Sequence, residues 1–388
     1  MKQFKNLLLL VVCLVVALIV AEVVMRLTWR PPAHTLAPNV RSRTTTAEYD
    51  VPIETNAEGF RDVATHPHFG GRVVVIGDSF VFGSGVSQGD VFSHNLSRVA
   101  PHFNVWNFGV PGSGPFNELY LWRDYGRPVR PHAVVVAVYA GNDVSDALRE
   151  SKEARPRFVI GRRAKLMWHR AFAKESATTA QPVQNREGWN AFGLDNPATE
   201  EALLAAAHKR GVSPDSVRAR LAAIPDSLKA DALAFRSNPF NLAEAVLDPD
   251  GLRHNLLLDT PAMNEGWKEL EDALTKLNRE VNASGSRLLL VCIPAAVQVD
   301  STYWWLKNLG VRLDERVTQD TVFQHRLAEF AKTQDIPLVD LLPGLRKRST
   351  ARLYYEQDGH WTAAGHDAAA RLISERLFEI LPTTNWTE

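Results

Sequence analysis

The hydrophobic pattern begins with a long apolar run near the N-terminus. Residues 7–21 carry no charge, and after Glu22 the run resumes as Val23–Met25. Residues 7–25 together are long enough for a tilted membrane span. Residues 7–21 alone have the length that is typical of a signal-peptide core. We expect residues 1–32 to form an uncleaved signal anchor and linker, with the rest of the chain exported across the membrane. A signal cleaved after Ala21, with secretion, is the main alternative, and a buried core helix is the other.

The body of the chain alternates short apolar runs with amphipathic segments. The apolar runs lie at residues 72–76, 104–108, 133–139, 288–293 and 336–339. The first contains four consecutive β-branched residues, which is typical of a strand buried on both faces. Helical spacing is seen between and after these runs, at residues 91–99, 116–125, 267–281, 321–333 and 364–381. This alternation predicts a three-layer α/β/α domain with a parallel sheet of about five strands, spanning residues 33–388.

Two segments do not follow this alternation. Residues 145–262 contain short helical pieces with clear starts, such as Ser213 followed by Pro214, an N-cap followed by proline at the first helical position. We predict a helical insertion here, between the third and fourth strands, that serves as a lid or a partner surface. Residues 33–70 are polar with little periodicity, and no element is predicted there.

Composition narrows the function classes. The chain has 388 residues, with 44 basic and 44 acidic side chains and 45% hydrophobic residues, which excludes a wholly disordered chain and argues against nucleic-acid binding. The two cysteines, Cys13 and Cys292, both lie in apolar runs. They exclude a disulfide framework and a cysteine-based zinc site. The spacing of His, Asp and Glu predicts no metal site, and we expect no cofactor.

Polar residues follow three of the predicted strands, where ligands bind in open α/β sheets. Ser79 follows the first strand, Gly112 the second and Asn142 the third. A nucleophilic serine needs a base, and the base needs an orienting group. His360 and Asp358, just before the last helix, are of the right types. The N–H groups of Ser79 and Gly112 and the Asn142 amide are suitable donors to an oxyanion.

Taken together, these blocks resemble the SGNH/GDSL hydrolase family. They appear in family order as Gly77–Phe80, Asn107–Gly112, Ala140–Asp143 and Asp358–His360. The resemblance implies a flavodoxin-like fold with Ser79 as nucleophile, His360 as base, Asp358 as orienting acid, and Ser79, Gly112 and Asn142 as oxyanion donors. Thr55–Asp62 also resembles the segment that precedes the first block in membrane-anchored bacterial members, which are often associated with cell-surface polysaccharides.

Three positions depart from the family pattern. Phe80 replaces the commoner leucine, and Ala140 replaces a glycine. The last block is D-x-H, so a strict D-x-x-H spacing puts Gln357 in the acid position, where it has no charge to orient the imidazole. We assign the acid to Asp358, because the shorter spacing occurs in members that act in alginate acetylation.

Each assignment has a purely structural alternative. Ser79 is alternatively a turn serine that caps a helix, His360 a surface histidine and Asp358 a loop carboxylate, while Gly112 and Asn142 shape turns. Other nearby residues are predicted to be structural, namely Asp78, Asp143 and His366.

A basic run lies inside the predicted insertion. Its cations include Arg155, Arg157, Arg162, Arg163 and Lys165, with no acidic residue among them. One interpretation is a solvated helix face, and the other is contact with anionic lipid or an acidic polysaccharide.

The predicted activity is that of a serine esterase. We expect an acyl-Ser79 intermediate formed from an O-acyl ester, with O-acetyl groups of an extracytoplasmic carbohydrate as the substrate. An O-acetyltransferase that uses the same triad for exopolysaccharide modification is the first alternative. An inactive carbohydrate-binding or assembly scaffold is the second.

Overall fold

The computed structural model describes residues 2–28, 32–62, 66, 70–154, 196–300, 303–348 and 351–381. The chain divides into two units: one contains residues 1–32 and 151–181, the other residues 33–150 and 182–388. The basic run at Arg155, Arg157, Arg162, Arg163 and Lys165 lies outside the described residues. The predicted domain boundaries stay predictions.

The first unit contains the N-terminal helix α1 (Lys2–Thr28). Its segment Phe4–Met25 is long and apolar enough to cross a membrane, and none of it is buried within the structure. A helix that exposes this many leucine and valine side chains needs an apolar environment.

The second unit is built on a five-stranded parallel sheet in the order β4-β3-β5-β6-β7, as predicted. The strands are β3 (Gly71–Gly77), β4 (Phe103–Gly109), β5 (Ala133–Tyr139), β6 (Arg287–Ile293) and β7 (Leu338–Asp340). In chain order this is 2-1-3-4-5, the flavodoxin-like arrangement, which has its switch point beside the first strand. Ile76 of β3 is aligned with Phe108 of β4 and with Val136 of β5. The carboxyl ends of these three strands therefore meet at one edge of the sheet.

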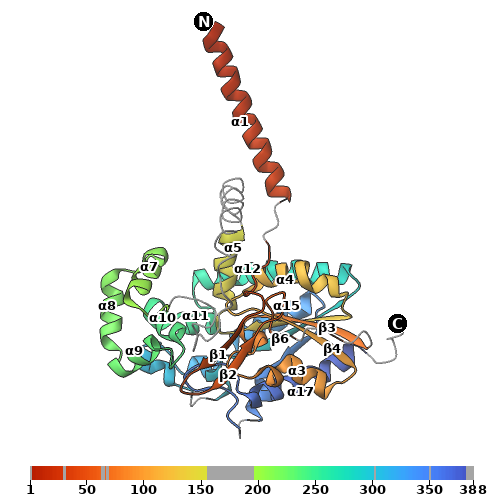
Figure 1. Cartoon of the computed structure of the whole chain (residues 1–388), viewed down its shortest axis with the longest axis vertical. Helices are drawn as coiled ribbons and strands as arrows, with labels where there is room; N and C mark the ends of the chain where they lie inside the picture. Colours follow the sequence, from red (N-terminus) through yellow and green to blue (C-terminus); the bar gives the residue numbers. More distant parts are fainter. Residues whose placement is uncertain are drawn as a thin grey trace. The chain divides into compact units, whose positions relative to one another are not determined.

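Helices cover both faces of the sheet, which is the predicted three-layer arrangement (Figure 1). One face carries the nucleophile helix α2 (Ser79–Phe82), α3 (Phe92–Val99), α16 (Leu341–Arg346) and α17 (Ala363–Ile380). The other carries α4 (Pro115–Leu121), α5 (Asp143–Ala154), α11 (Gly251–Leu257), α12 (Pro261–Ala283) and α15 (Val322–Thr333). Each face buries one continuous apolar cluster, because the central strands are apolar on both sides.

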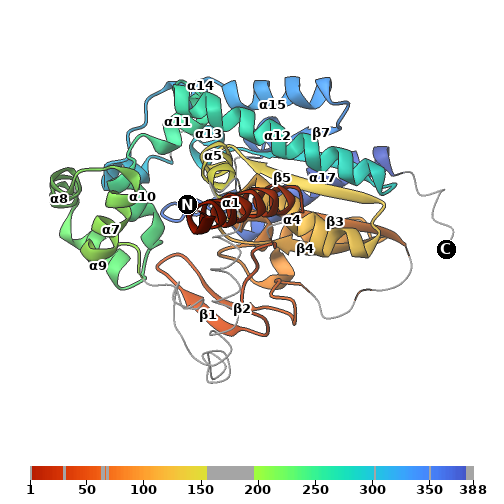
Figure 2. The ribbon, with the colours of Figure 1, turned by 90° about the horizontal axis from the view of Figure 1, so that it is seen from above.

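Four further helices follow β5 along the chain and form a cluster of their own (Figure 2). They are α7 (Glu200–Arg210), α8 (Pro214–Ala223), α9 (Asp226–Leu233) and α10 (Pro239–Leu247). Ser213 caps α8 and Pro214 is its first residue, as predicted. Leu203, Val217 and Val246 are fully buried in a separate apolar cluster, to which Leu309 also contributes.

The sequence pattern predicted no particular element in residues 33–70, and the structure shows one there. An antiparallel hairpin forms here from β1 (Arg41–Thr45) and β2 (Asp50–Glu54). Val51 and Ile53 are buried and alternate with exposed residues, the pattern of a strand with one covered face. The hairpin matters for function because its turn, residues 46–49, contacts the predicted catalytic loop.

Candidate active site

The predicted nucleophile lies at a sharp strand-to-helix junction. Ser79 is the first residue of α2, directly after β3 and the N-cap Asp78, whose Oδ1 accepts from Phe80 N at 2.9 Å. Gly109 packs against this turn so closely that an added Cβ would lie 2.1 Å from Phe82 N. The short helix therefore sits directly on the end of β4, which fixes the Ser79 side chain at the edge of the sheet.

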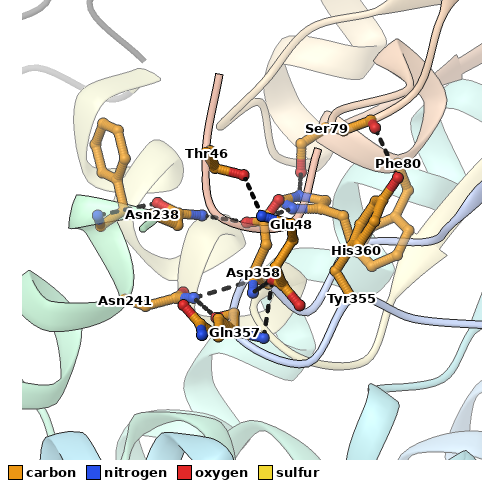
Figure 3. A network of polar contacts seen from close by, with 12 residues as sticks. Thr46, Glu48, Ser79, Phe80, Asn238, Asn241, Tyr355, Gln357, Asp358 and His360 are labelled. Carbon is orange, nitrogen blue, oxygen red and sulfur yellow. Dashed lines mark hydrogen bonds and ion pairs between the residues drawn. The ribbon is translucent and has the colours of Figure 1, made fainter. Parts of the chain in front are cut away.

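Three predicted residues form one hydrogen-bonded chain (Figure 3). Ser79 Oγ is 2.7 Å from His360 Nε2, and His360 Nδ1 is 3.1 Å from Asp358 Oδ1. Gly359 between the acid and the base has φ +81°, a left-handed conformation that favours glycine. This tight turn lets residues only two positions apart meet, so the D-x-H spacing brings Asp358 to the imidazole.

The contact between His360 and Asp358 shifts the pKa of each side chain. Burial lowers the pKa of His360, but the Asp358 carboxylate and Asp78 oppose it, and the net pKa is raised. Burial likewise raises the pKa of Asp358, while His360 and two further hydrogen-bond donors bring it below its ordinary value. An ionised acid beside an imidazole of raised basicity is the state that a general base requires.

The predicted oxyanion donors lie in the loops after β4 and β5, on either side of β3. Gly112 is exposed, with φ +73° and open space where a Cβ would point. Asn142 is half-buried, and its Oδ1 has no hydrogen-bond partner in the described part of the chain. Arg149 of α5 donates to Gly112 O at 3.4 Å and pairs with Asp146 of the same helix. A role for Gly112 and Asn142 as donors stays a prediction.

Three neighbouring residues have structural contacts, as predicted. Asp78 caps α2 and Asp143 Oδ2 accepts from Tyr139 N at 2.8 Å. His366 is buried, with its Nδ1 accepting from Phe92 N at 3.2 Å, and burial lowers the pKa of His366 to about 3.

Besides Asp358, three other carboxyl groups are buried near the site. Burial raises the pKa of Asp78 to about 6 and raises the pKa of Asp143 and Glu118 well above their ordinary values. Neither carboxyl oxygen of Glu118 has a partner among the described residues. Asp143 and Glu118 therefore favour the neutral form, whereas hydrogen-bond donors stabilise the charge of Asp358.

The segment Thr55–Asp62 holds the loop that follows the nucleophile helix. Arg61 is fully buried and donates to the carbonyl oxygens of Gly83 and Val86. Asp62 Oδ2 accepts from Asn107 N at 3.2 Å. The segment therefore ties the turn after α2 to β4.

Four residues at the site were missed by the sequence analysis, and all approach the Asp358 loop. Tyr49 OH donates to Asp358 Oδ2 at 2.8 Å, and Asn238 Nδ2 donates to Asp358 Oδ1 at 2.6 Å. Glu48 accepts from the N–H groups of residues 356–358 at 2.7, 3.0 and 2.9 Å. Asn241 Nδ2 donates to the carbonyl oxygen of Gln357 at 2.8 Å. No motif in the sequence signals these residues.

Metal ligation has no support in the described part of the chain, where no group of three or more His, Cys, Asp or Glu side chains is arranged to hold an ion. The predicted absence of a cofactor stays a prediction.

Comparisons with known proteins give distant structural likenesses and one family match. A search of the curated proteins finds no match. A G-D-S-L family lipolytic protein from Desulfitobacterium hafniense DCB-2 has 12% identity and a TM-score of 0.38, covering 79% of this chain and 99% of that one. A catalytic mutant of Axe2, an acetylxylan esterase from Geobacillus stearothermophilus, has 13% identity and a TM-score of 0.37, covering 81% and 96%. With TM-scores below 0.5, these likenesses carry no weight for the substrate.

A family match is more specific. Residues 253–385, which include β6, β7 and the loop of Asp358 and His360, match the family described as the SGNH hydrolase-like domain of acetyltransferase AlgX. The five-stranded parallel sheet agrees with this match. Residues 253–385 are thus similar to an SGNH hydrolase-like domain.

Proposed function

We propose that the protein is a serine esterase that acts through an acyl-Ser79 intermediate on O-acyl esters, with O-acetyl groups of an extracytoplasmic carbohydrate as substrates. The observation that carries the proposal is the chain of hydrogen bonds from Ser79 through His360 to Asp358. Its geometry is that of a nucleophile, a base within hydrogen-bond reach and an orienting acid.

The first half of the reaction forms the acyl-enzyme. Ser79 Oγ attacks the ester carbonyl carbon while its proton passes to His360 Nε2. The carbonyl oxygen becomes an oxyanion, for which the N–H groups of Ser79 and Gly112 and the Asn142 amide are the proposed donors. The ester C–O bond then breaks, and the leaving alkoxide takes the proton from His360.

The second half returns the enzyme. His360 removes a proton from water, the hydroxide attacks the acyl carbon, and the bond to Ser79 Oγ breaks as the serine recovers its proton. When a sugar hydroxyl replaces water, the same steps transfer the acyl group to the sugar. The family match to a domain of an acetyltransferase favours this second candidate function specifically.

The proposed location of the reaction rests on α1. A helix long and apolar enough to cross a membrane supports an anchor in the bacterial inner membrane. A catalytic domain in the periplasm is consistent with the proposed carbohydrate substrate. Contact of Arg155, Arg157, Arg162, Arg163 and Lys165 with anionic lipid or an acidic polysaccharide remains part of this proposal.

The test measures the release and the transfer of acetyl groups by the full chain in detergent. An O-acetylated oligosaccharide is incubated with the wild type and with Ser79→Ala, and free acetate and acetylated products are quantified. Acetate release that disappears in Ser79→Ala supports the esterase, and gain of acetyl groups on an added unacetylated acceptor supports the transferase. If a folded wild type shows neither reaction over several donors, the scaffold interpretation replaces both.

A further inference from the structure

The catalytic acid lies in a loop that is held from two sides by segments outside the four sequence blocks. One is the turn of the β1–β2 hairpin, with Glu48 and Tyr49, and the other is the start of α10 in the insertion, with Asn238 and Asn241 (Figure 3). The contacts join residues 309 and 120 positions apart in the sequence.

Tyr49 and Asn238 contact the Asp358 carboxylate itself. Glu48 and Asn241 instead contact the backbone of the loop. Asp358 Oδ1 accepts from His360 Nδ1 and Asn238 Nδ2, and Oδ2 accepts from Tyr49 OH. Both donors are buried, with exposed fractions of 7% and 8%, so water does not replace them easily. Hydrogen bonds to a charged acceptor are about twice as strong as neutral ones.

Both donors are themselves fixed in orientation. The Asn238 Oδ1 atom accepts from Phe240 N at 3.0 Å as the N-cap of α10, which turns its NH₂ group towards Asp358. The ring of Tyr49 packs on Tyr355 at 4.9 Å, and the adjacent Glu48 binds the three backbone N–H groups of the loop. The two donors therefore reach the carboxylate from segments with little freedom to move.

We propose that Tyr49 and Asn238 are positioning residues that orient the Asp358 carboxylate towards His360 Nδ1, so that the hairpin and the insertion are parts of the catalytic apparatus. This inference rests on the proposed function of Ser79, His360 and Asp358. It assigns the insertion a role inside the site, beyond that of a lid or a partner surface.

Removal of either donor has a defined electrostatic effect. With one donor fewer, the negative charge of Asp358 acts more strongly on His360, and the pKa of the imidazole rises. Other titratable groups that interact with the pair are Glu48, Tyr139 and Tyr355 near Asp358, and Asp78 and His366 near His360. None of these is altered by the two substitutions.

The experiment measures the pH dependence of kcat/KM for p-nitrophenyl acetate hydrolysis by the full chain in detergent. The acid limb of this profile is the fall in kcat/KM at low pH, where His360 becomes protonated. We expect Tyr49→Phe and Asn238→Ala each to move this limb to higher pH by about half a pH unit. We expect kcat to fall about tenfold, as the imidazole loses its alignment. KM should change little, because neither side chain is proposed to bind substrate.

Matched controls separate positioning from general support of the loop. Tyr355→Phe removes a phenol whose OH donates to Gly85 O at 2.9 Å, and Asn241→Ala removes an amide that donates to the carbonyl oxygens of residues 357 and 358. Neither donor touches the carboxylate, so these variants should leave the acid limb in place. Acid limbs that stay at the wild-type pH in Tyr49→Phe and Asn238→Ala, or that move equally in the controls, would overturn the proposal.

Two additions keep the test decisive. If Asn238→Ala does not fold, Asn238→Asp keeps an N-cap residue on α10 and places a second negative charge beside Asp358, so the acid limb should move further upward. The pKa of His360 can also be followed by NMR in Ser79→Ala without any turnover. An upward shift there without activity in the wild type would uphold the positioning role and reject the proposed function, while no shift would reject the positioning role.

Discussion

At the scale of single residues, the backbone at Gly112 is strained for any other amino acid. Its φ of +73° costs a residue with a Cβ about 1–2 kcal/mol, although the space beside it is open. We expect Gly112→Ala to lower kcat about 10²-fold, because a displaced N–H is a lost oxyanion donor. Ester hydrolysis kinetics measure this effect.

Gly211 provides the control for this substitution. It ends α7 with φ +71° and has the same open space for a Cβ, so Gly211→Ala carries a similar backbone strain. A loss of kcat in Gly211→Ala equal to that in Gly112→Ala would show that strain, and not a lost donor, lowers the rate.

The second prediction at this scale concerns Glu118. Burial, with help from Asp78 and Glu150, raises the pKa of Glu118 well above its ordinary value. Stability from this group is complete below its unfolded pKa and is lost as pH rises through the folded pKa. Glu118→Gln should therefore raise the free energy of unfolding by about 1–3 kcal/mol at alkaline pH and change it little near pH 4.

Thermal unfolding across pH measures the Glu118 effect. Glu150→Gln is the matched control, because Glu150 accepts from the N–H groups of Gly114, Phe116 and Asn117 and its substitution should destabilise. A Glu118→Gln protein that is less stable than the wild type at alkaline pH would contradict the assignment of a neutral Glu118.

The sequence predicted the three residues of the hydrogen-bonded series but not the residues that contact Asp358. Ser79, Asp358 and His360 stand beside glycines at strand ends or before a helix, and the structure brings them together. Tyr49 and Asn238 lie in a turn and at a helix start far away in the sequence. Their approach to Asp358 depends on tertiary packing that no local pattern records.

At the scale of elements, the close contact of α2 with the end of β4 determines where Ser79 lies. We expect Gly109→Ala to destabilise the fold by about 1–3 kcal/mol, because the added Cβ lies 2.1 Å from Phe82 N and the backbone has to move. Gly89→Ala is the control, since no atom lies within 4 Å of a Cβ there. Denaturation midpoints that are equal in the two variants would contradict this close packing.

The same scale shows where local patterns predict elements and where they do not. The run at 133–139 matched β5 in full, since its β-branched side chains are almost all buried. The strand expected at 336–339 is β7 (Leu338–Asp340), whose three residues are only half-buried at the sheet edge. Val51 and Ile53 of β2 gave too short an alternation to be recognised among polar neighbours.

At the scale of the whole molecule, the N-terminal helix is predicted to stay attached. Glu22 interrupts the apolar run near its end, and Ile19 does not fit the small-residue pattern that precedes a cleavage site. We expect the mature protein to retain residues 1–32 and to remain in the membrane fraction after carbonate extraction. Intact-mass measurement checks this, and a soluble form that begins at Glu22 would contradict it.

The central claim is that His360 activates Ser79, and fluorophosphonate labelling of the full chain in detergent tests it most directly. The probe reacts with serines that a base has activated. We predict labelling of the wild type and of Ser216→Ala, a half-buried serine in α8, and none of Ser79→Ala or His360→Ala. Labelling that persists in either catalytic variant, or a folded wild type that is not labelled, would contradict the account.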